Sequence, residues 1–247
     1  MENIRKFAII SIPRTGSNML VGALDAHPEI VCHYEIFHVD DIYYSGMYDF
    51  DWSKHFTKET RNERPQKFLN FVLSQALSEK TKAIGFKIFQ DQNNSFMKKI
   101  ANRDDIDKVF LKRKNYLLSR VSQLEAEQSG VYDITIDKKD RLNKSQKIFL
   151  DIEKFLYYEN RKRLYFEQFE NIAKTRNQRM ISLEYETLLE IENQKKLLSF
   201  LEVEPNPDLL EIRFKKQNEK KLKDRIVNYK QLCARLSGTP YEKYLEE

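Results

Sequence analysis

The sequence predicts an α/β fold, with a central parallel sheet of about five strands and helices on both faces. Short apolar runs such as residues 7–12 (FAIISI) and 83–89 (AIGFKIF) have the composition of strands buried on both faces. Segments with apolar residues at helical spacing alternate with these runs, as in parallel sheets joined by crossover helices. A chain of 247 residues with 40% hydrophobic and 33% charged residues suits one domain, residues 1–247.

The first strand and the helix after it frame a short loop. Pro13 ends the strand because it has no N–H for the ladder. Apolar residues recur at helical spacing from Met19 onward, so we expect a helix from near Ser17. A second strand over residues 30–34 should end at Glu35, and an irregular stretch rich in Asp, Tyr and Phe follows over residues 37–52.

The rest of the chain continues the alternation. We expect a helix over residues 64–78, strands at 83–89 and around 109–111, a helix over 115–127, a long helix or helix pair over 148–172, a strand at 180–183, and helices over 187–201 and 220–236. The polar, charged segment of residues 132–147 is predicted to be a mobile loop or lid.

Composition excludes several classes of protein. No apolar run approaches the roughly 20 residues of a membrane-spanning helix, so we expect no transmembrane segment. The charged start of the chain enters the first strand directly, which leaves no room for a signal peptide and favours a cytoplasmic location. Cys32 and Cys233 are expected to be free core thiols, and the absence of a His/Cys cluster predicts no metal site. The net charge of +5 is diffuse, so no nucleic-acid partner is expected, and a homodimer is compatible with the sequence.

The loop between the first strand and its helix has the character of an anion site. A tight strand–loop–helix turn directs backbone N–H groups and the positive end of the helix dipole at one point. Gly16 allows close backbone approach, and the side chains around it add donors; the loop comprises Pro13, Arg14, Thr15, Gly16, Ser17 and Asn18. In the triphosphate-binding P-loop, GxxxxGK followed by Ser or Thr, a lysine and a Mg²⁺-binding hydroxyl stand where this chain has Ser17 and Asn18. The loop should therefore hold a smaller anion without an obligatory metal.

Charged residues beyond the loop also fall at predicted strand ends. Arg113 lies at the carboxyl end of the fourth strand, where ligands bind in open α/β sheets and where a guanidinium can clamp a phosphate. Glu35 ends the second strand and is a candidate general base, with His33 as the reserve base because strand alternation would point it the same way. Lys87 lies within an apolar strand, so it needs an anionic partner or an exit to water.

Together, PRTGSNML and HPEIVCHYEIF (residues 13–20 and 27–37) resemble the bacterial carbohydrate sulfotransferases of nodulation-factor, lipopolysaccharide and trehalose-glycolipid type. The resemblance implies a P-loop-kinase-like fold, 3′-phosphoadenosine 5′-phosphosulfate (PAPS) as the donor and 3′-phosphoadenosine 5′-phosphate (PAP) as the product. It assigns Glu35 the role of base and Lys87 a contact with the transferring sulfonate. Arg14 stands where many eukaryotic members carry a lysine.

The resemblance extends to the adenosine end of the donor. It implies a 3′-phosphate site built from Arg113 and a helical serine. The common eukaryotic spacing of eight residues would fall on Val121, so Ser122, nine residues on as in some bacterial members, is the candidate, with Ser119 one turn earlier. Lys216 and Gln217 belong to a segment that resembles the family's cofactor-covering region.

The acceptor is less constrained by the sequence. The resemblance favours a sugar hydroxyl, whereas the acidic and aromatic stretch after the second strand suits a cationic natural product. The candidate acceptor residues are Asp40, Tyr43, Tyr44 and Trp52. Two other functions remain alternatives: a small-molecule kinase on the same fold, and a non-catalytic nucleotide or nucleic-acid binding module.

Overall fold

A parallel sheet forms the centre of the protein. The computed structural model describes residues 4–90, 92, 94–132, 146–211 and 220–246. Its strands are β1 (Arg5–Ser11), β2 (Ile30–His33), β3 (Ala83–Phe89), β4 (Asp107–Lys112) and β5 (Met180–Glu184). They pair in parallel in the order β2-β3-β1-β4-β5. The chain order reverses between β1 and β4, and the carboxyl ends of strands at such a reversal are where open α/β sheets bind ligands.

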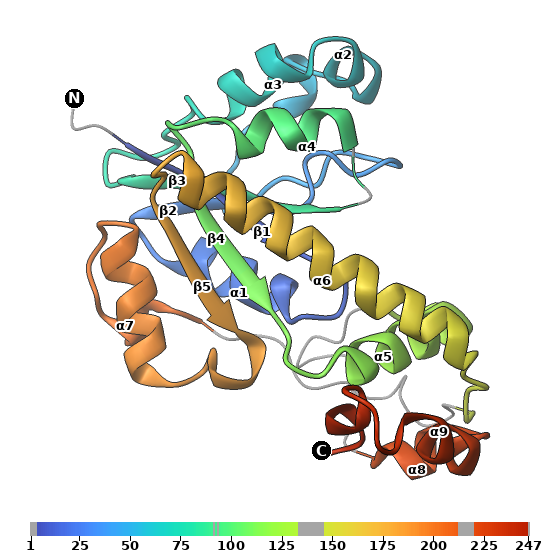
Figure 1. The fold of residues 1–247 in the computed structure, drawn as a ribbon. Helices are drawn as coiled ribbons and strands as arrows, with labels where there is room; N and C mark the ends of the chain where they lie inside the picture. The colour runs from blue at the N-terminus through green and yellow to red at the C-terminus, as the bar shows by residue number, and fades with distance from the viewer. Residues whose placement is uncertain (1–3, 91, 93, 133–145, 212–219, 247) are drawn as a thin grey trace.

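Helices cover both faces of the sheet (Figure 1), which confirms the predicted fold class. The helices are α1 (Ser17–Ala26), α2 (Lys58–Glu63), α3 (Pro65–Val72), α4 (Asn94–Ala101), α5 (Tyr116–Ser129), α6 (Ile152–Thr175), α7 (Ile191–Phe200), α8 (Leu222–Arg225) and α9 (Tyr229–Leu236). Short 3₁₀ turns lie at Trp52–Lys54, Tyr185–Thr187, Pro207–Leu209 and Glu242–Leu245. Helices α3, α4 and α6 pack on one face of the sheet, and α1 and α7 pack on the other.

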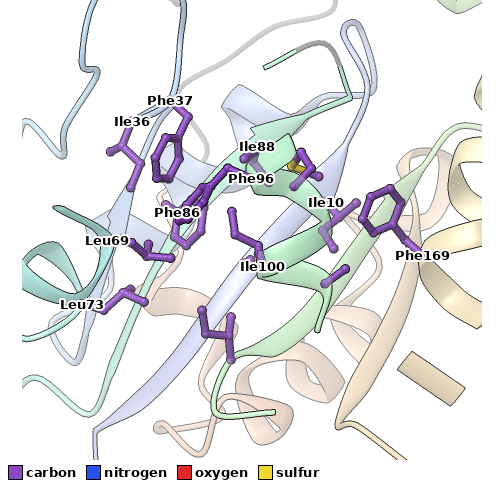
Figure 2. Packing of buried hydrophobic residues seen from close by; sticks show 14 of the residues in the cluster. Ile10, Ile36, Phe37, Leu69, Leu73, Phe86, Ile88, Phe96, Ile100 and Phe169 are labelled. Carbon is purple, nitrogen blue, oxygen red and sulfur yellow. The ribbon is translucent and has the colours of Figure 1, made fainter. Parts of the chain in front are cut away.

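The core of the first face is built from aromatic and branched side chains. Phe86 and Ile10 project from the strands toward Leu69 of α3, Ile100 of α4 and Phe169 of α6, as Figure 2 shows. Within the sheet, the Phe7 ring lies 2.5 Å from where a Cβ of Gly85 would stand, so β3 accepts only glycine opposite that ring. This packing holds β1 and β3 at a fixed register, and both strands lead into the candidate site.

Several helices differ from the prediction. The predicted helix over residues 64–78 is found as α3, which ends at Val72, and the unpredicted helix α2 precedes it; the two are separate because Pro65 begins a new helix and Arg64 before it leaves the helical region. The predicted helix over residues 220–236 is divided, since Ile226 is extended and pairs with Ile148. Helix α4 was not predicted at all. The apolar face of α4 consists of only a few residues, among them Phe96 and Ile100.

The C-terminal part packs on α5 rather than on the sheet. Helices α8 and α9 and the last 3₁₀ turn share a separate apolar cluster with Leu117 and Val121 of α5. Arg225 of α8 also forms an ion pair with Glu125 of α5 at 2.7 Å. In the described part of the chain, no helix is long and apolar enough to cross a membrane.

Candidate active site at the carboxyl edge of the sheet

The loop between β1 and α1 leaves the start of a helix open. Gly16 has a φ of 73° and is the residue before α1, and its carbonyl accepts the Leu20 N–H at 3.0 Å. Arg14 also has a positive φ of 66°, which is unusual for a residue with a side chain. The residue before α1 is a glycine, so it supplies no side-chain cap to the first turn. The amides and the dipole of this turn are groups that can receive an anion.

Two hydroxyls brace this loop from beneath. The Ser11 hydroxyl lies 2.6 Å from that of Thr15 and donates to the Leu111 carbonyl at 2.9 Å. The Thr15 hydroxyl also contacts the Ile12 carbonyl at 2.8 Å, and Thr15 is completely buried. In this arrangement the Thr15 side chain fixes the loop, so only its backbone N–H can serve an anion.

The Tyr185 ring closes one side of the loop. A Cβ at Gly16 would lie 2.5 Å from this ring, so a side chain at this position is excluded twice, by the backbone conformation and by the contact. The same ring lies 4.9 Å from the Arg113 guanidinium, which is a cation–π distance. No local pattern in the sequence indicated that Tyr185 would meet Gly16 from a distant part of the chain.

The structure brings Arg113 and Ser122 to the same loop residue. Arg113 Nη1 donates to the Arg14 carbonyl at 2.9 Å, and Arg14 Nε donates to the Ser122 hydroxyl at 3.1 Å. Ser119, the alternative serine, instead donates to the Pro13 carbonyl at 3.1 Å. Burial lowers the pKa of Arg113, and its Nε is buried without a hydrogen-bond partner among the described residues. Such a donor costs free energy unless a ligand or water accepts from it.

Lys87 connects the loop between β1 and α1 to Glu35, just after β2. Its side chain is 1% exposed, and Nζ lies 2.7 Å from Glu35 Oε1. The same Nζ donates to the side-chain oxygen of Asn18 at the start of α1. Gln92 donates to the other oxygen of Glu35. Sequence reasoning missed Gln92, whose only local signal is its place just after β3.

His33 holds the chain after β2 rather than facing this cluster. The Ser45 N–H donates to His33 Nδ1 at 3.0 Å, so the ring proton is on Nε2 and no lone pair is left to accept another. Burial lowers the pKa of His33 to about 3, and the ring stands edge-on to Trp52 with 4.9 Å between centroids. This geometry is contrary to the expectation of a reserve base. The alternation on which that expectation rested stops at His33, where β2 ends.

The buried Asp25 carboxylate holds Ser45, whose N–H donates to His33. The Ser45 hydroxyl contacts both Asp25 oxygens, at 2.8 and 2.7 Å, and the Cys32 N–H donates to Asp25 at 3.1 Å. Burial raises the pKa of Asp25 to about 6, although these hydrogen bonds lower it. Asp25 thus anchors residue 45 of the irregular stretch to α1 and β2.

The four candidate acceptor residues separate into two pairs. Trp52 is 7% exposed and stacks on Tyr44 at 4.4 Å, so this pair belongs to the packing of the irregular stretch. Tyr43 is 45% exposed, and Asp40 is exposed with its carboxylate 3.7 Å from His38 Nδ1. The Tyr43 N–H donates to the Glu35 carbonyl at 3.4 Å, which keeps this second pair beside the Lys87–Glu35 cluster.

One buried arginine shapes this segment, and sequence reasoning missed it. Arg61 of α2 is 2% exposed, and its Nη1 donates to the carbonyls of Ile36, His38 and Asp41 at 3.1, 2.8 and 3.0 Å. Three carbonyls gathered on one cation fold the chain tightly just after Glu35. Lys216, Gln217 and nearly all of the predicted lid, residues 132–147, lie outside the described residues.

No protein-family model and no curated protein matches the chain. Among solved structures, a sulfotransferase from Alicyclobacillus acidocaldarius aligns with a TM-score of 0.51 at 13% identity, over 99% of this chain and 95% of that chain. A mouse sulfotransferase complexed with PAP aligns with a TM-score of 0.47 at 11% identity, over 98% of this chain and 87% of that chain. At such identities the first likeness establishes a shared fold and nothing finer, and the second is too weak to support an argument.

Proposed function

We propose that the protein is a sulfotransferase that uses PAPS and transfers its sulfonate group to a hydroxyl, or an amine or carbamate nitrogen, of a sugar, glycolipid or small polar natural product. The observation that carries this proposal is the position of Lys87. One buried cation contacts both Asn18 of the anion loop and Glu35, the candidate base. Donor anion, cation and base can thus meet at one point.

The residues present fit the donor. The open first turn of α1 suits the 5′-phosphosulfate, since a helix N-terminus binds such anions through its amides. The buried Arg113 Nε suits the 3′-phosphate, because it is a charged donor with an unmet hydrogen bond among the described residues. The Ser122 hydroxyl, which accepts from Arg14, can add a second donor to the 3′-phosphate.

The chemistry requires few groups. The acceptor oxygen or nitrogen attacks the sulfur in line, a new bond to sulfur forms, and the bond from sulfur to the 5′-phosphate oxygen breaks. Glu35 takes the acceptor's proton. The loop amides, Arg14 and Lys87 stabilise the charge on the sulfonate and on the departing phosphate.

The acceptor should bind beside Tyr43 and Asp40. These side chains are exposed next to the segment that carries Glu35, and an aromatic ring with a carboxylate suits a cationic or polyhydroxyl group. Tyr44 and Trp52 pack beneath them and would act through the shape of the segment.

The kinase alternative fits the loop less well. A triphosphate loop uses a lysine and a hydroxyl at the two positions where this chain has Ser17 and Asn18, and the Asn18 amide oxygen accepts from Lys87. A nucleic-acid binding module would bind single strands with a steep salt dependence, which the same calorimetric assay can measure.

Calorimetry with PAP, PAPS and Mg·ATP tests the proposal. We expect PAP and PAPS to bind equally well in EDTA and in Mg²⁺, and more tightly than Mg·ATP. Turnover of [³⁵S]PAPS against panels of sugars and cationic metabolites then identifies the acceptor. Tighter binding of Mg·ATP than of PAPS would favour the kinase, and binding of single-stranded nucleic acid alone would favour the module.

A further inference from the structure

Two apolar side chains project side by side from the C-terminal region. Ile148 and Ile226 form a parallel bridge, with N–H···O contacts of 2.8 Å on either side of it. Side chains alternate along extended chains, so the buried pair Ile148 and Ile226 is followed by an outward pair, Phe149 and Val227. These two side chains are 67% and 62% exposed.

Several lysines lie near this apolar pair in the sequence. Lys147 lies beside Lys223, because its Nζ donates to the Lys223 carbonyl at 3.2 Å. Apart from Lys154, the described lysines that are exposed and within six residues of Phe149 or Val227 are Lys147, Lys221, Lys223 and Lys230. The exposed acids of the same stretch are Asp151, Glu153 and Asp224. Two of these acids pair with cations other than the four lysines, Glu153 with Arg235 at 3.1 Å and Asp151 with Lys154 at 3.4 Å.

We propose that this basic apolar patch, defined as Phe149 and Val227 with those four lysines, docks on an anionic lipid surface. Apolar tips that enter the interface and lysines that meet anionic head groups are the two components of such binding. A protein partner fits the composition less well, because lysine is depleted from protein–protein interfaces. A two-fold contact with a second copy would bring the lysines of both copies together, which like charges oppose.

The patch lies at the end of the molecule where the candidate active site is found. Figure 1 shows α8 and α9 beside α5, at the end of the sheet toward which β4 runs. The helices that flank the patch and the carboxyl edge of the sheet thus lie at the same end of the molecule. The proposal stands on this surface alone and does not require the sulfotransferase function.

Sedimentation of the full chain with vesicles tests the proposal. We expect binding to vesicles of phosphatidylcholine with phosphatidylglycerol, no binding to phosphatidylcholine alone, and weaker binding as salt rises. Replacing Phe149 and Val227 together by serine should weaken binding at least tenfold. Lys147→Gln with Lys223→Gln should weaken it about fivefold per lysine. The matched control is Tyr157→Ser with Leu164→Ser, two α6 side chains that are 65% and 49% exposed and lie outside the patch.

Several results would overturn the proposal. These are absence of binding, equal binding to both kinds of vesicle, or a Phe149→Ser, Val227→Ser variant that binds as well as the wild type. A dimer in light scattering that this variant abolishes would show that a second copy covers the patch. Unfolding curves show whether each variant is folded, and the lysine pair gives an independent test if the apolar pair does not fold.

Discussion

Lys87 Nζ lies 2.7 Å from Glu35 Oε1, in a pair whose lysine is 1% exposed and whose glutamate is 17% exposed. A lysine so deeply buried inside a strand is stable only when its charge is compensated. Here the compensating carboxylate is the one positioned to accept a proton, and the same ammonium reaches Asn18 at the anion loop. Ion pairing thus fixes the relative positions of the proposed base and of the group that would meet the sulfonate.

The first prediction concerns Glu35. Glu35→Gln keeps the shape of the side chain but removes its ability to accept a proton. With an acceptor found in the turnover screen, kcat should fall roughly 10²–10⁴-fold while PAP affinity stays near the wild-type value. Steady-state kinetics and calorimetry measure the two quantities. Glu63→Gln, an exposed carboxylate on α2, is the control and should keep full activity. An active Glu35→Gln enzyme would mean that Glu35 orients the acceptor or pairs with Lys87 without taking the proton.

The second prediction concerns Arg113. Arg113→Ala should weaken binding of PAP by about 1.5–3 kcal/mol, because a charge-assisted contact to the 3′-phosphate is lost. Adenosine 5′-phosphosulfate lacks that phosphate, so its affinity should change much less. Calorimetry of both ligands measures the difference, and Lys114→Ala, the exposed neighbour paired with Glu184 at 2.8 Å, is the control. Equal weakening of both ligands would show that Arg113 supports the loop through Arg14 instead of reading the 3′-phosphate.

The sequence was sufficient for features that depend on neighbours in the chain. The strands were predicted because each is a short apolar run, and the start of α1 near Ser17 was predicted from the helical spacing of apolar residues from Met19 onward. The contacts that complete the site are different in kind. Tyr185 against Gly16, Gln92 on Glu35 and Arg61 on three carbonyls each join distant segments, and no spacing rule connects such pairs. For His33 the alternation rule was applied beyond the strand, where it no longer determines direction.

The third prediction concerns Gly16. Gly16→Ala places a Cβ on a residue with a positive φ, which costs about 1–2 kcal/mol. The same Cβ would lie 2.5 Å from the Tyr185 ring. Because the Arg113 guanidinium lies over that ring, 4.9 Å from its centroid, displacement of Tyr185 should weaken PAP binding as well. Urea unfolding and calorimetry measure the two effects.

Gly130→Ala separates the two contributions. Gly130 has a φ of 69°, and nothing described lies within 4 Å of the place where its Cβ would stand, so this variant reports the backbone cost alone. Gly16→Ala should therefore lower the free energy of unfolding by more than Gly130→Ala does, and only Gly16→Ala should affect PAP. Equal losses of stability with unchanged PAP affinity would show that the Tyr185 ring moves aside freely.

The last prediction concerns the pH dependence of stability at Asp25. Burial raises the pKa of this carboxyl to about 6 in the folded protein, against about 3.9 in an unfolded chain. Because the folded pKa is the higher one, the stabilisation from the protonated form is complete below about pH 4 and is lost as the pH rises through about 6. Asp25→Asn cannot ionise. The free energy of unfolding of this variant, relative to that of the wild type, should therefore rise by about 2–3 kcal/mol between pH 4 and pH 7.

Urea unfolding of both proteins at several pH values measures this difference, and taking the difference cancels the other titrating groups. Asp104 provides a control of opposite sign, because hydrogen bonds from Arg176 and Gln178 lower its pKa to about 2. Asp104→Asn should therefore lose stability relative to the wild type as the pH rises from about 2 to about 5. If the Asp25→Asn difference stays flat from about pH 4 to about pH 7, then Asp25 ionises in the folded protein as it does in water. The contacts from Ser45 and Cys32 would in that case compensate fully for its burial.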